Sequence, residues 1–549
     1  MNSTTTKPMI SIARLLPLAM MVALLLTGAA YAAVPGITGP VFGLTAAPAS
    51  ITQPDGQMIY SWGYGCTGTP GGYVPSTITT TPACSSMQIP GPTLVVKEGQ
   101  TVTVTLTNSL PTAAGNTSIL FPGFNVTASG GVTGLLTQEA VPGSTVTYTF
   151  TASSPGTRAY YSGTQSDLQV EMGLYGAIIV IPTATPAGCT AVGGMPAHYV
   201  DTALGNTAEA DFRLASSAYD SAKTCYDREY LFQFSEMDPN IHAQALAQVN
   251  ARTGCTLGAA GCSLDVPTEP YHPAYFMING RSMPDDMDPN YAAEYAHQPY
   301  NGNPHMHPGE QVLLRIIGQG RWQHPFHEHG NHVRILARDG NLILSQGDPN
   351  NSLAGPLLFT TTTTPGLAMD GIFYWTGRGL NWDAYGHNSA SSDPLAKLPC
   401  VPDANGYNTQ GTAVTALNYY EWCQDHNKPV QAAPFGDVAG GGPVTLPDPN
   451  ILTNGAWYGG SPYLGPNATE RATGCSNGAS AGTNAANCGT TGTTPPSGTI
   501  ANSPSSEAGF AFMWHSHNER EITTNNIFPG GMMMMMLVDS REFQIDESN

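Results

Sequence analysis

Apolar and polar residues alternate along two series of short segments, which is the pattern of β-strands that bury one face. Residues 101–108 alternate threonine with valine and leucine, and residues 146–150 repeat the pattern. A second series begins at residues 229–234 and continues at 312–317. Turns rich in glycine and proline separate the segments, and no long amphipathic helix is evident. The pattern therefore predicts an all-β protein built from tandem Greek-key β-sandwich domains.

Length and composition agree with this fold class. A chain of 549 residues can bury two or more full cores. Only 11% of its residues are charged, and 62 glycines and 45 prolines suit a secreted protein with many turns. The formal net charge of -20 argues against nucleic acid or an anionic membrane as a partner.

The first 32 residues read as a secretory signal peptide. Lys7 and Arg14 form a short positively charged region before an apolar run at residues 15–26, and small residues at 30–32 suit a cleavage site. The apolar run is short for a membrane span, although a retained N-terminal anchor is the alternative. We expect a mature chain without a membrane span, located outside the cell, in the periplasm or at the cell surface.

Ten cysteines follow the signal, and their spacing groups them as neighbours. An even number in an exported protein indicates five disulfides. The expected pairs are Cys66–Cys84, Cys189–Cys225, Cys255–Cys262, Cys400–Cys423 and Cys475–Cys488. No cysteine motif indicates a metal-binding thiol.

Two pairs of histidines carry the candidate chemistry. His515 and His517 follow an apolar strand, and His327 and His329 have the same spacing. Side chains two residues apart on a strand point to the same face, so each pair forms half of a metal site.

The histidine segments, at residues 324–330 and 513–519, resemble the C-terminal copper motifs of the multicopper oxidases. Residues 90–183 also resemble the first cupredoxin domain of that family, in the order and spacing of their strands and turns. The resemblance implies tandem cupredoxin-like domains with a long loop-rich insertion. The expected divisions are a signal peptide at 1–32, an arm or irregular first strands at 33–88, a first domain at 89–183, a linker at 184–226, a second domain beginning at 227–345, the insertion at 346–508, and the last strands at 509–545.

Several positions depart from the family's copper ligands. His324 matches a type-1 copper histidine, but Ser516 stands where the cysteine belongs and Glu521 where the second histidine belongs. A type-1 site requires a thiolate, which a hydroxyl cannot replace, so we expect no type-1 copper.

The first domain lacks its share of the trinuclear cluster. Leu120, Pro122, Tyr161 and Gly163 occupy the positions of the family's two histidine pairs there. The conclusion does not depend on alignment, because the chain has no histidine before His198.

The surviving histidines suit one copper, with zinc as the alternative. The candidate metal residues are His327, His329, His515 and His517, with His324 at the lost type-1 position; no catalytic residue is identified. Glu328 should face away from its histidine neighbours. His305 and His307 are expected in an exposed loop, and the methionines at 532–536 in a core strand.

Three functions remain open at this point. The preferred one is a metal-binding cupredoxin protein that has lost the oxidase electron-transfer chain. The others are a copper-dependent oxidoreductase with a mononuclear or inter-subunit site, and a structural or assembly protein of the surface. By analogy with two-domain family members, a trimer is the expected oligomer.

Overall fold

The computed structural model describes most of the chain, in several separate ranges. These are residues 34–74, 84, 87–187, 189, 191–192, 195–196, 216–350, 352–378, 401–409, 420–422, 424, 461–464, 508–539 and 545. The predicted signal peptide lies outside them. No helix within these ranges is long and apolar enough to span a membrane.

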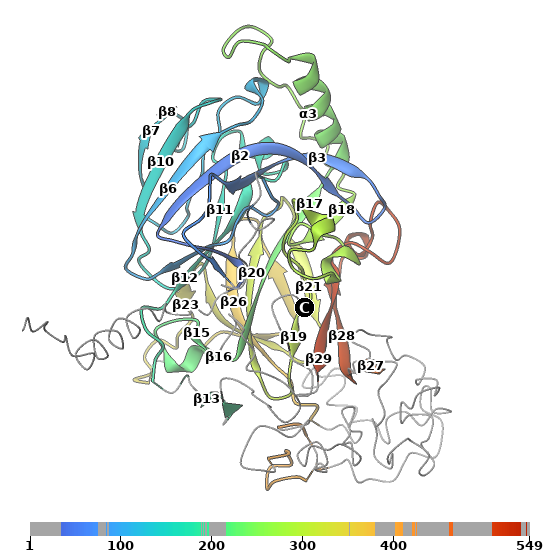
Figure 1. Ribbon diagram of the computed structural model, residues 1–549. Helices are drawn as coiled ribbons and strands as arrows, with labels where there is room; N and C mark the ends of the chain where they lie inside the picture. The colour runs from blue at the N-terminus through green and yellow to red at the C-terminus, as the bar shows by residue number, and fades with distance from the viewer. Residues whose placement is uncertain are drawn as a thin grey trace, which may run out of the picture.

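The first sandwich consists of two five-stranded sheets (Figure 1). One sheet has the order β11 (Gly156–Tyr161), β12 (Tyr175–Ile181), β5 (Leu94–Lys97), β1 (Gly36–Thr38), β4 (Tyr73–Val74). The other has the order β3 (Met58–Cys66), β2 (Val41–Thr52), β6 (Thr101–Asn108), β10 (Thr145–Thr151), β7 (Thr127–Gly130). The threonine–valine alternation produces this packing: Val102, Val104 and Leu106 of β6 are fully buried in the core, while the threonines between them are more exposed.

Residues 33–88 form more than an arm. Strands β1 and β4 belong to one sheet of the first sandwich, and β2 and β3 belong to the other. The 12-residue strand β2 pairs with β6 in parallel and buries Phe42, Leu44 and Ala46. Glycine, alanine and proline on β2 weaken the contrast between its two faces, which is why the sequence pattern understated the strand.

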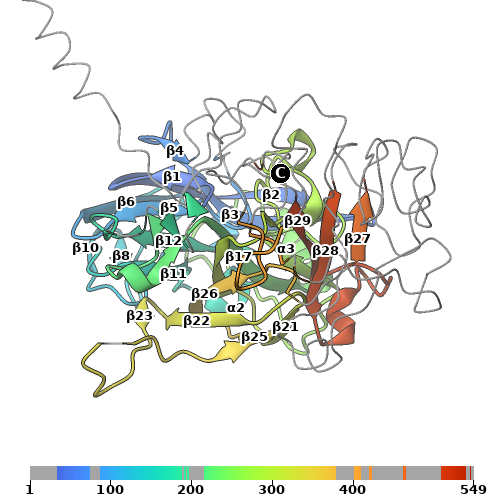
Figure 2. The ribbon, with the colours of Figure 1, turned by 90° about the horizontal axis from the view of Figure 1, so that it is seen from below.

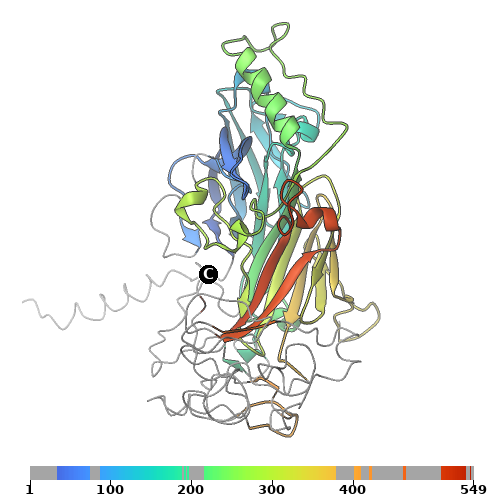
Figure 3. The ribbon, with the colours of Figure 1, turned by 90° about the vertical axis from the view of Figure 1, so that its right-hand side faces the viewer.

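The second sandwich has a larger pair of sheets, coloured green to red in Figure 1. The first has the order β18 (Tyr275–Ile278), β17 (Arg228–Met237), β20 (Gln311–Gly318), β26 (Ala368–Tyr374), β22 (Val333–Arg338), β23 (Asn341–Leu342), with β24 (Leu357–Leu358) also paired to β22. The second has the order β19 (His305–Met306), β29 (Met533–Asp539), β28 (Ala508–Ser516), β21 (His324–Glu328), β25 (Thr360–Thr363), with β27 (Ser461–Leu464) also paired to β28. Figure 3 shows β28 and β29, in red, alongside the yellow and orange strands of the same sandwich.

The expected insertion at 346–508 begins too early. Strands β24, β25 and β26 fall inside that range, yet all three belong to the sheets of the second sandwich. Strand β26 runs between β20 and β22 and buries Met369 and Phe373 in the core. Its buried glycine and aspartate interrupt the apolar pattern, and so the sequence did not reveal it as a central strand.

One well-formed helix, α3 (Pro239–Ala251), was not expected. Asp238 caps its N-terminus by accepting a hydrogen bond from the Asn240 backbone, with proline at the first helical position. Although α3 lies between β17 and β18 in sequence, Ile241 and Ala245 pack into the core of the first sandwich. The helix therefore covers one end of that sandwich, as Figure 1 shows.

The remaining short elements lie at turns and edges. They are η2 (Thr112–Ala114), β8 (Val132–Thr133), β9 (Gln138–Glu139), α2 (Ser166–Gln169), β13 (Ala191–Val192), β14 (Met195–Pro196), β15 (Ser216–Ser217), η3 (Ala222–Thr224), β16 (Cys225–Tyr226), η4 (Asp285–Met287), η5 (Ala293–Tyr295) and η8 (Glu519–Ile522). β15 and β16 form a hairpin at the end of the predicted linker.

Buried polar contacts join the two sandwiches. The Thr157 hydroxyl of β11 donates a 2.5 Å hydrogen bond to Asp370 of β26. Arg315 donates to the same threonine and forms an ion pair with Glu229 at 2.6 Å. The fully buried guanidinium is thus compensated, as buried charges must be. The all-β fold class predicted from the sequence is confirmed.

Three of the five expected disulfides fall within the described residues, and all three form as expected. They are Cys66–Cys84, Cys189–Cys225 and Cys255–Cys262. The pairs Cys400–Cys423 and Cys475–Cys488 lie outside the described residues.

Candidate metal centre

Strands β21 and β28 bring the two histidine pairs together. They run antiparallel, and His327 is the direct cross-strand partner of His515. Because alternate residues of a strand share a face, His329 and His517 extend from the same face beyond the strand ends. The core side of both strands is apolar, with Phe326 and Trp514 buried.

The four imidazole rings form one compact cluster. The ring centroids of His327 and His517 are 4.5 Å apart, and those of His327 and His329 are 4.9 Å apart. The distances from His515 to His517, His329 and His327 are 5.0, 5.3 and 5.7 Å. His327 is buried, His329 is half-buried and His517 is exposed, so the cluster opens to the surface on one side.

Two of the rings are oriented by hydrogen bonds at Nδ1. The Nδ1 atom of His515 lies 2.8 Å from the Ser516 carbonyl oxygen, and that of His327 lies 2.8 Å from the Thr360 hydroxyl. A carbonyl only accepts, so Nδ1 of His515 carries the proton and Nε2 is the nitrogen with a lone pair. Outer hydrogen bonds of this kind set the tautomer of metal-binding histidines.

Burial and mutual proximity keep these rings neutral. Burial, followed by the neighbouring rings of His517 and His515, lowers the pKa of His327 to about 4. Burial and the other three rings lower the pKa of His329 to about 3. Burial also lowers the pKa of His515. At neutral pH these imidazoles are unprotonated, which is the form that binds a metal ion.

The rings converge without forming a finished coordination sphere. Within the described ranges, no group of three or more His, Cys, Asp or Glu side chains is arranged as a ready metal site. The donor set itself fits copper or zinc, since both accept neutral imidazole nitrogen.

The three positions that the sequence resemblance assigned to a type-1 site, His324, Ser516 and Glu521, also meet in space. His324 lies between two buried carboxylates: Nε2 is 2.9 Å from Glu236 and Nδ1 is 2.9 Å from Glu521. The Ser516 hydroxyl donates a 2.5 Å hydrogen bond to Glu521. His324 therefore does not join the four-histidine cluster, because both of its nitrogens are engaged elsewhere.

The charge on His324 follows from these neighbours. Burial lowers its pKa, but hydrogen bonding to Glu236 and Glu521 and the charges on these carboxylates outweigh burial and raise the pKa to about 9. The ring is an imidazolium at neutral pH. A protonated ring carries a hydrogen on both nitrogens, here facing Glu236 and Glu521, and so has no lone pair for a metal ion.

Glu236 was not among the residues predicted from the sequence. It lies on β17, 88 positions before His324, and also accepts from the backbones of Arg321 and Trp322. β17 carries two buried glutamates, Glu229 and Glu236, and each indicates from the sequence only that some buried partner exists.

The first sandwich brings together Leu120, Tyr161 and Gly163, three of the positions that the sequence resemblance aligned with the family's other histidines. The backbones of Leu120 and Tyr161 are hydrogen-bonded to each other at 2.7 and 3.3 Å. A side chain at Gly163 would contact Leu120. The residues found there are apolar, aromatic or glycine, and they offer no imidazole.

His305 and His307 do not lie in an exposed loop. Both are buried, with His305 on β19, which pairs with β29. Nδ1 of His305 is 2.5 Å from the Asp539 carboxylate, and Nδ1 of His307 is 3.1 Å from the Asp539 carbonyl. The prolines and glycine around them resembled a loop, and the distant partner Asp539 could not be inferred from local sequence.

Glu328 faces away from the histidine cluster, as predicted. Its side chain is buried and accepts a 2.6 Å hydrogen bond from Thr361. Burial raises the pKa of Glu328 to about 8.

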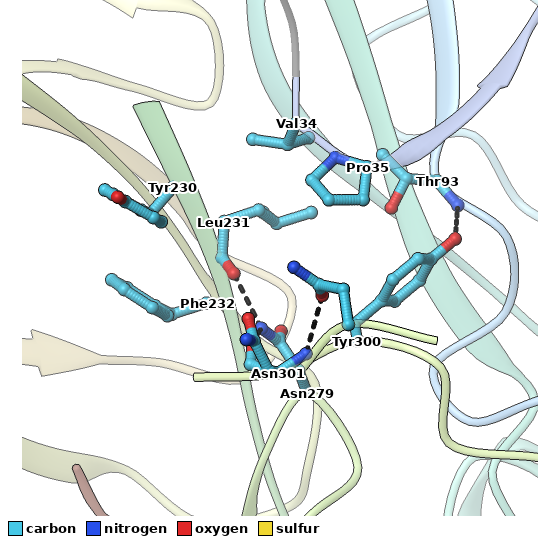
Figure 4. Close-up of a pocket in the computed structure, with 10 residues that line it drawn as sticks. Val34, Pro35, Thr93, Tyr230, Leu231, Phe232, Asn279, Tyr300 and Asn301 are labelled. Carbon is cyan, nitrogen blue, oxygen red and sulfur yellow. Dashed lines mark hydrogen bonds between the residues drawn. The ribbon is translucent and has the colours of Figure 1, made fainter. Parts of the chain in front are cut away.

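Two cavities of the described residues lie away from the four histidines. A cavity of about 20 Å³ lies against Val34, Tyr230 and Asn279, where Tyr300 receives a hydrogen bond from the Thr93 backbone (Figure 4). This volume suits one water molecule. A cleft of about 320 Å³ lies between the sandwiches, lined by Tyr161, Asp167 and Arg321 among others.

Comparison with known proteins gives one family match and several structures of low similarity. Residues 74–185 match the family model described as multicopper oxidase. No curated protein matches the chain. Among solved structures, the blue copper oxidase from Nitrosomonas europaea is similar at 15% identity over 91% of this chain and 85% of that chain, with a TM-score of 0.42. The multicopper oxidase mgLAC is similar at 15% identity over 92% and 88% of the two chains, also with a TM-score of 0.42.

The family match covers the segment whose strands and turns resembled the first cupredoxin domain in the sequence. The resemblance to the multicopper oxidase superfamily that was drawn from the sequence is confirmed for this segment.

Proposed function

We propose that this protein is an exported, cupredoxin-like metal-binding protein of the multicopper oxidase superfamily that has lost the oxidase electron-transfer chain. Its metal ion would bind at His327, His329, His515 and His517. The observation that carries the proposal is the convergence of these four rings, with centroid distances of 4.5 to 5.7 Å.

Copper is the preferred metal, with zinc as the alternative. Imidazole nitrogen binds either ion, and at most one ion fits four such ligands. When bound, copper would supply a redox-active Lewis acid. The protein's own contribution is to orient His327 and His515 through Nδ1 and to keep the rings unprotonated.

Loss of the electron-transfer chain rests on two separate sets of positions. Ser516 provides no thiolate, and its hydroxyl is committed to Glu521. The first sandwich provides Leu120, Pro122, Tyr161 and Gly163 in place of histidines. A four-electron reduction of oxygen needs both an electron entry site and several coppers, so this chain alone supports neither requirement.

The open side of the histidine cluster bears on the expected oligomer. His517 is exposed, and the exposed ring of Phe359 lies 5.6 Å from that of His327. A second subunit of the trimer expected by analogy would cover this side. The proposal also includes export of the protein by a signal peptide at residues 1–32 and the division of the remaining chain into two cupredoxin-like domains.

Metal analysis of the purified protein tests the central claim. We expect about one copper per chain after copper loading and dialysis, and loss of that copper in the double variant His515→Ala/His517→Ala. The control is His272→Ala, which removes an exposed imidazole outside the cluster. Full metal content in the double variant would place the site elsewhere and refute the proposal.

A further inference from the structure

The five consecutive methionines at residues 532–536 divide between two faces of one sheet. Met532, Met534 and Met536 are buried in the core of the second sandwich, as predicted for a core strand. Because β29 alternates, Met533 and Met535 point to the opposite face. The core therefore explains three of these residues and leaves two thioethers on the face that carries the histidines.

The strand register fixes which residues these two methionines adjoin. Met533 is the direct cross-strand partner of His515, and Met535 is the partner of Met513. Directly opposite residues in antiparallel strands have Cβ atoms about 4.5–5.5 Å apart. Trp514 and Met534 form the cross-strand pair between these two pairs, and both side chains lie in the core. This agrees with the register, because neighbouring pairs point to opposite faces of the sheet. Figure 2 shows β28 and β29 side by side.

A continuous row of donors thus crosses the sheet. From β25 to β29 it contains Thr360, His327, His515 and Met533. Met533 is only 4% exposed, so its sulfur is in a largely water-free setting beside a solvent-accessible imidazole cluster. The next row adds Met513 and Met535, and the Met535 backbone amide lies 3.3 Å from the sulfur of Met287.

We propose that Met533 supplies a thioether ligand beside His515, which makes this centre a cuprous copper site. The proposal rests on the metal site proposed above and specifies its metal and oxidation state. Thioether sulfur is a soft donor that favours Cu(I), whereas Zn(II) is satisfied by the imidazoles alone. The long, flexible side chain of Met533 stands directly opposite His515 on the neighbouring strand.

The variant Met533→Leu tests the proposal, since leucine keeps the volume and removes the sulfur. Affinity for Cu(I) is measured anaerobically by competition with bicinchoninate, and affinity for Zn(II) with a zinc-chelating dye. We expect Met533→Leu to weaken Cu(I) binding by about tenfold or more while changing Zn(II) binding less than about twofold. The matched control is Met534→Leu, one residue away on the core face, which should change neither affinity.

Spectroscopy gives a second readout. X-ray absorption of the Cu(I)-loaded protein should show a copper–sulfur path that is absent in Met533→Leu and present in Met534→Leu. Unchanged Cu(I) affinity and scattering in Met533→Leu, with copper still bound by the wild type, would overturn the thioether role alone. Equal loss of Cu(I) and Zn(II) affinity would show that Met533 only packs the site, which also overturns it. A wild-type protein that binds neither ion would overturn the proposed function itself.

Discussion

Replacing His324 by glutamine tests whether this side chain is the charged centre of a buried ion-pair network. In the folded protein this ring lies between Glu236 and Glu521 at 2.9 Å from each, and all three side chains are buried. Glutamine retains hydrogen-bonding capacity but has no positive charge, so two carboxylates would be left without their shared counter-ion.

The magnitude follows from the pKa of His324, which rises from 6.5 to about 9. At about 1.4 kcal/mol per pH unit, this corresponds to about 3 kcal/mol of stability. Breaking a buried ion pair by removing one partner typically costs about 3–5 kcal/mol, which agrees. Because the folded-state pKa is raised, the contribution is fully present below pH 6.5 and is lost as the pH rises through about 9.

The assay is urea unfolding followed by tryptophan fluorescence, with Trp375 and Trp514 reporting on the core of the second sandwich. We expect His324→Gln to lower the free energy of unfolding by about 3 kcal/mol at pH 6 and by much less at pH 10. His332→Gln, on a half-buried ring elsewhere, should cost under about 0.5 kcal/mol at both values. A cost for His324→Gln that is the same at pH 6 and pH 10 would refute the charged network.

Two further predictions concern activity and assembly. The copper-loaded protein should not oxidise phenols with reduction of oxygen to water. The double variant Ser516→Cys/Glu521→His should show blue absorption but still not reduce oxygen, because the first sandwich has no histidines. Stoichiometric water formation by the wild type would mean that another chain completes the cluster. Light scattering should give the mass of a trimer, and a monomeric mass across a range of concentrations would exclude the oligomer expected by analogy.

The histidine cluster could be predicted because it depends on local geometry. The i, i+2 spacing of His327 with His329, and of His515 with His517, determines their common face on any strand. The resemblance to a known family then indicated that the two strands are neighbours, and the register His327 to His515 agrees.

The partners of His324 and His305 could not be predicted in the same way. Glu236 and Asp539 lie 88 and 234 positions away from them in sequence. A buried carboxylate has no local pattern, since its position is determined by the tertiary approach of strands that are far apart in the chain. For the same reason α3 was missed: only Ile241, His242 and Ala245 are buried, so its apolar stripe is short, and that stripe packs on a different sandwich from its neighbours in sequence.

The methionine run shows how alternation can hide a second role. A run of one residue type has no apolar–polar contrast, so the sequence predicted core packing for the strand as a whole. The sheet separates the run into Met534 on the core side and Met533 beside His515. Only the register distinguishes them, and one residue of slip would exchange their faces.

Four buried side chains join separate elements of the second sandwich. Ser516, Glu521, His324 and Glu236 connect β28, η8, β21 and β17 through hydrogen bonds and ion pairs of 2.5 to 2.9 Å. The His324 imidazolium supplies positive charge between the two carboxyl groups. The second sandwich can therefore hold these four elements together without copper, which separates the stability of the fold from metal binding at the histidine cluster.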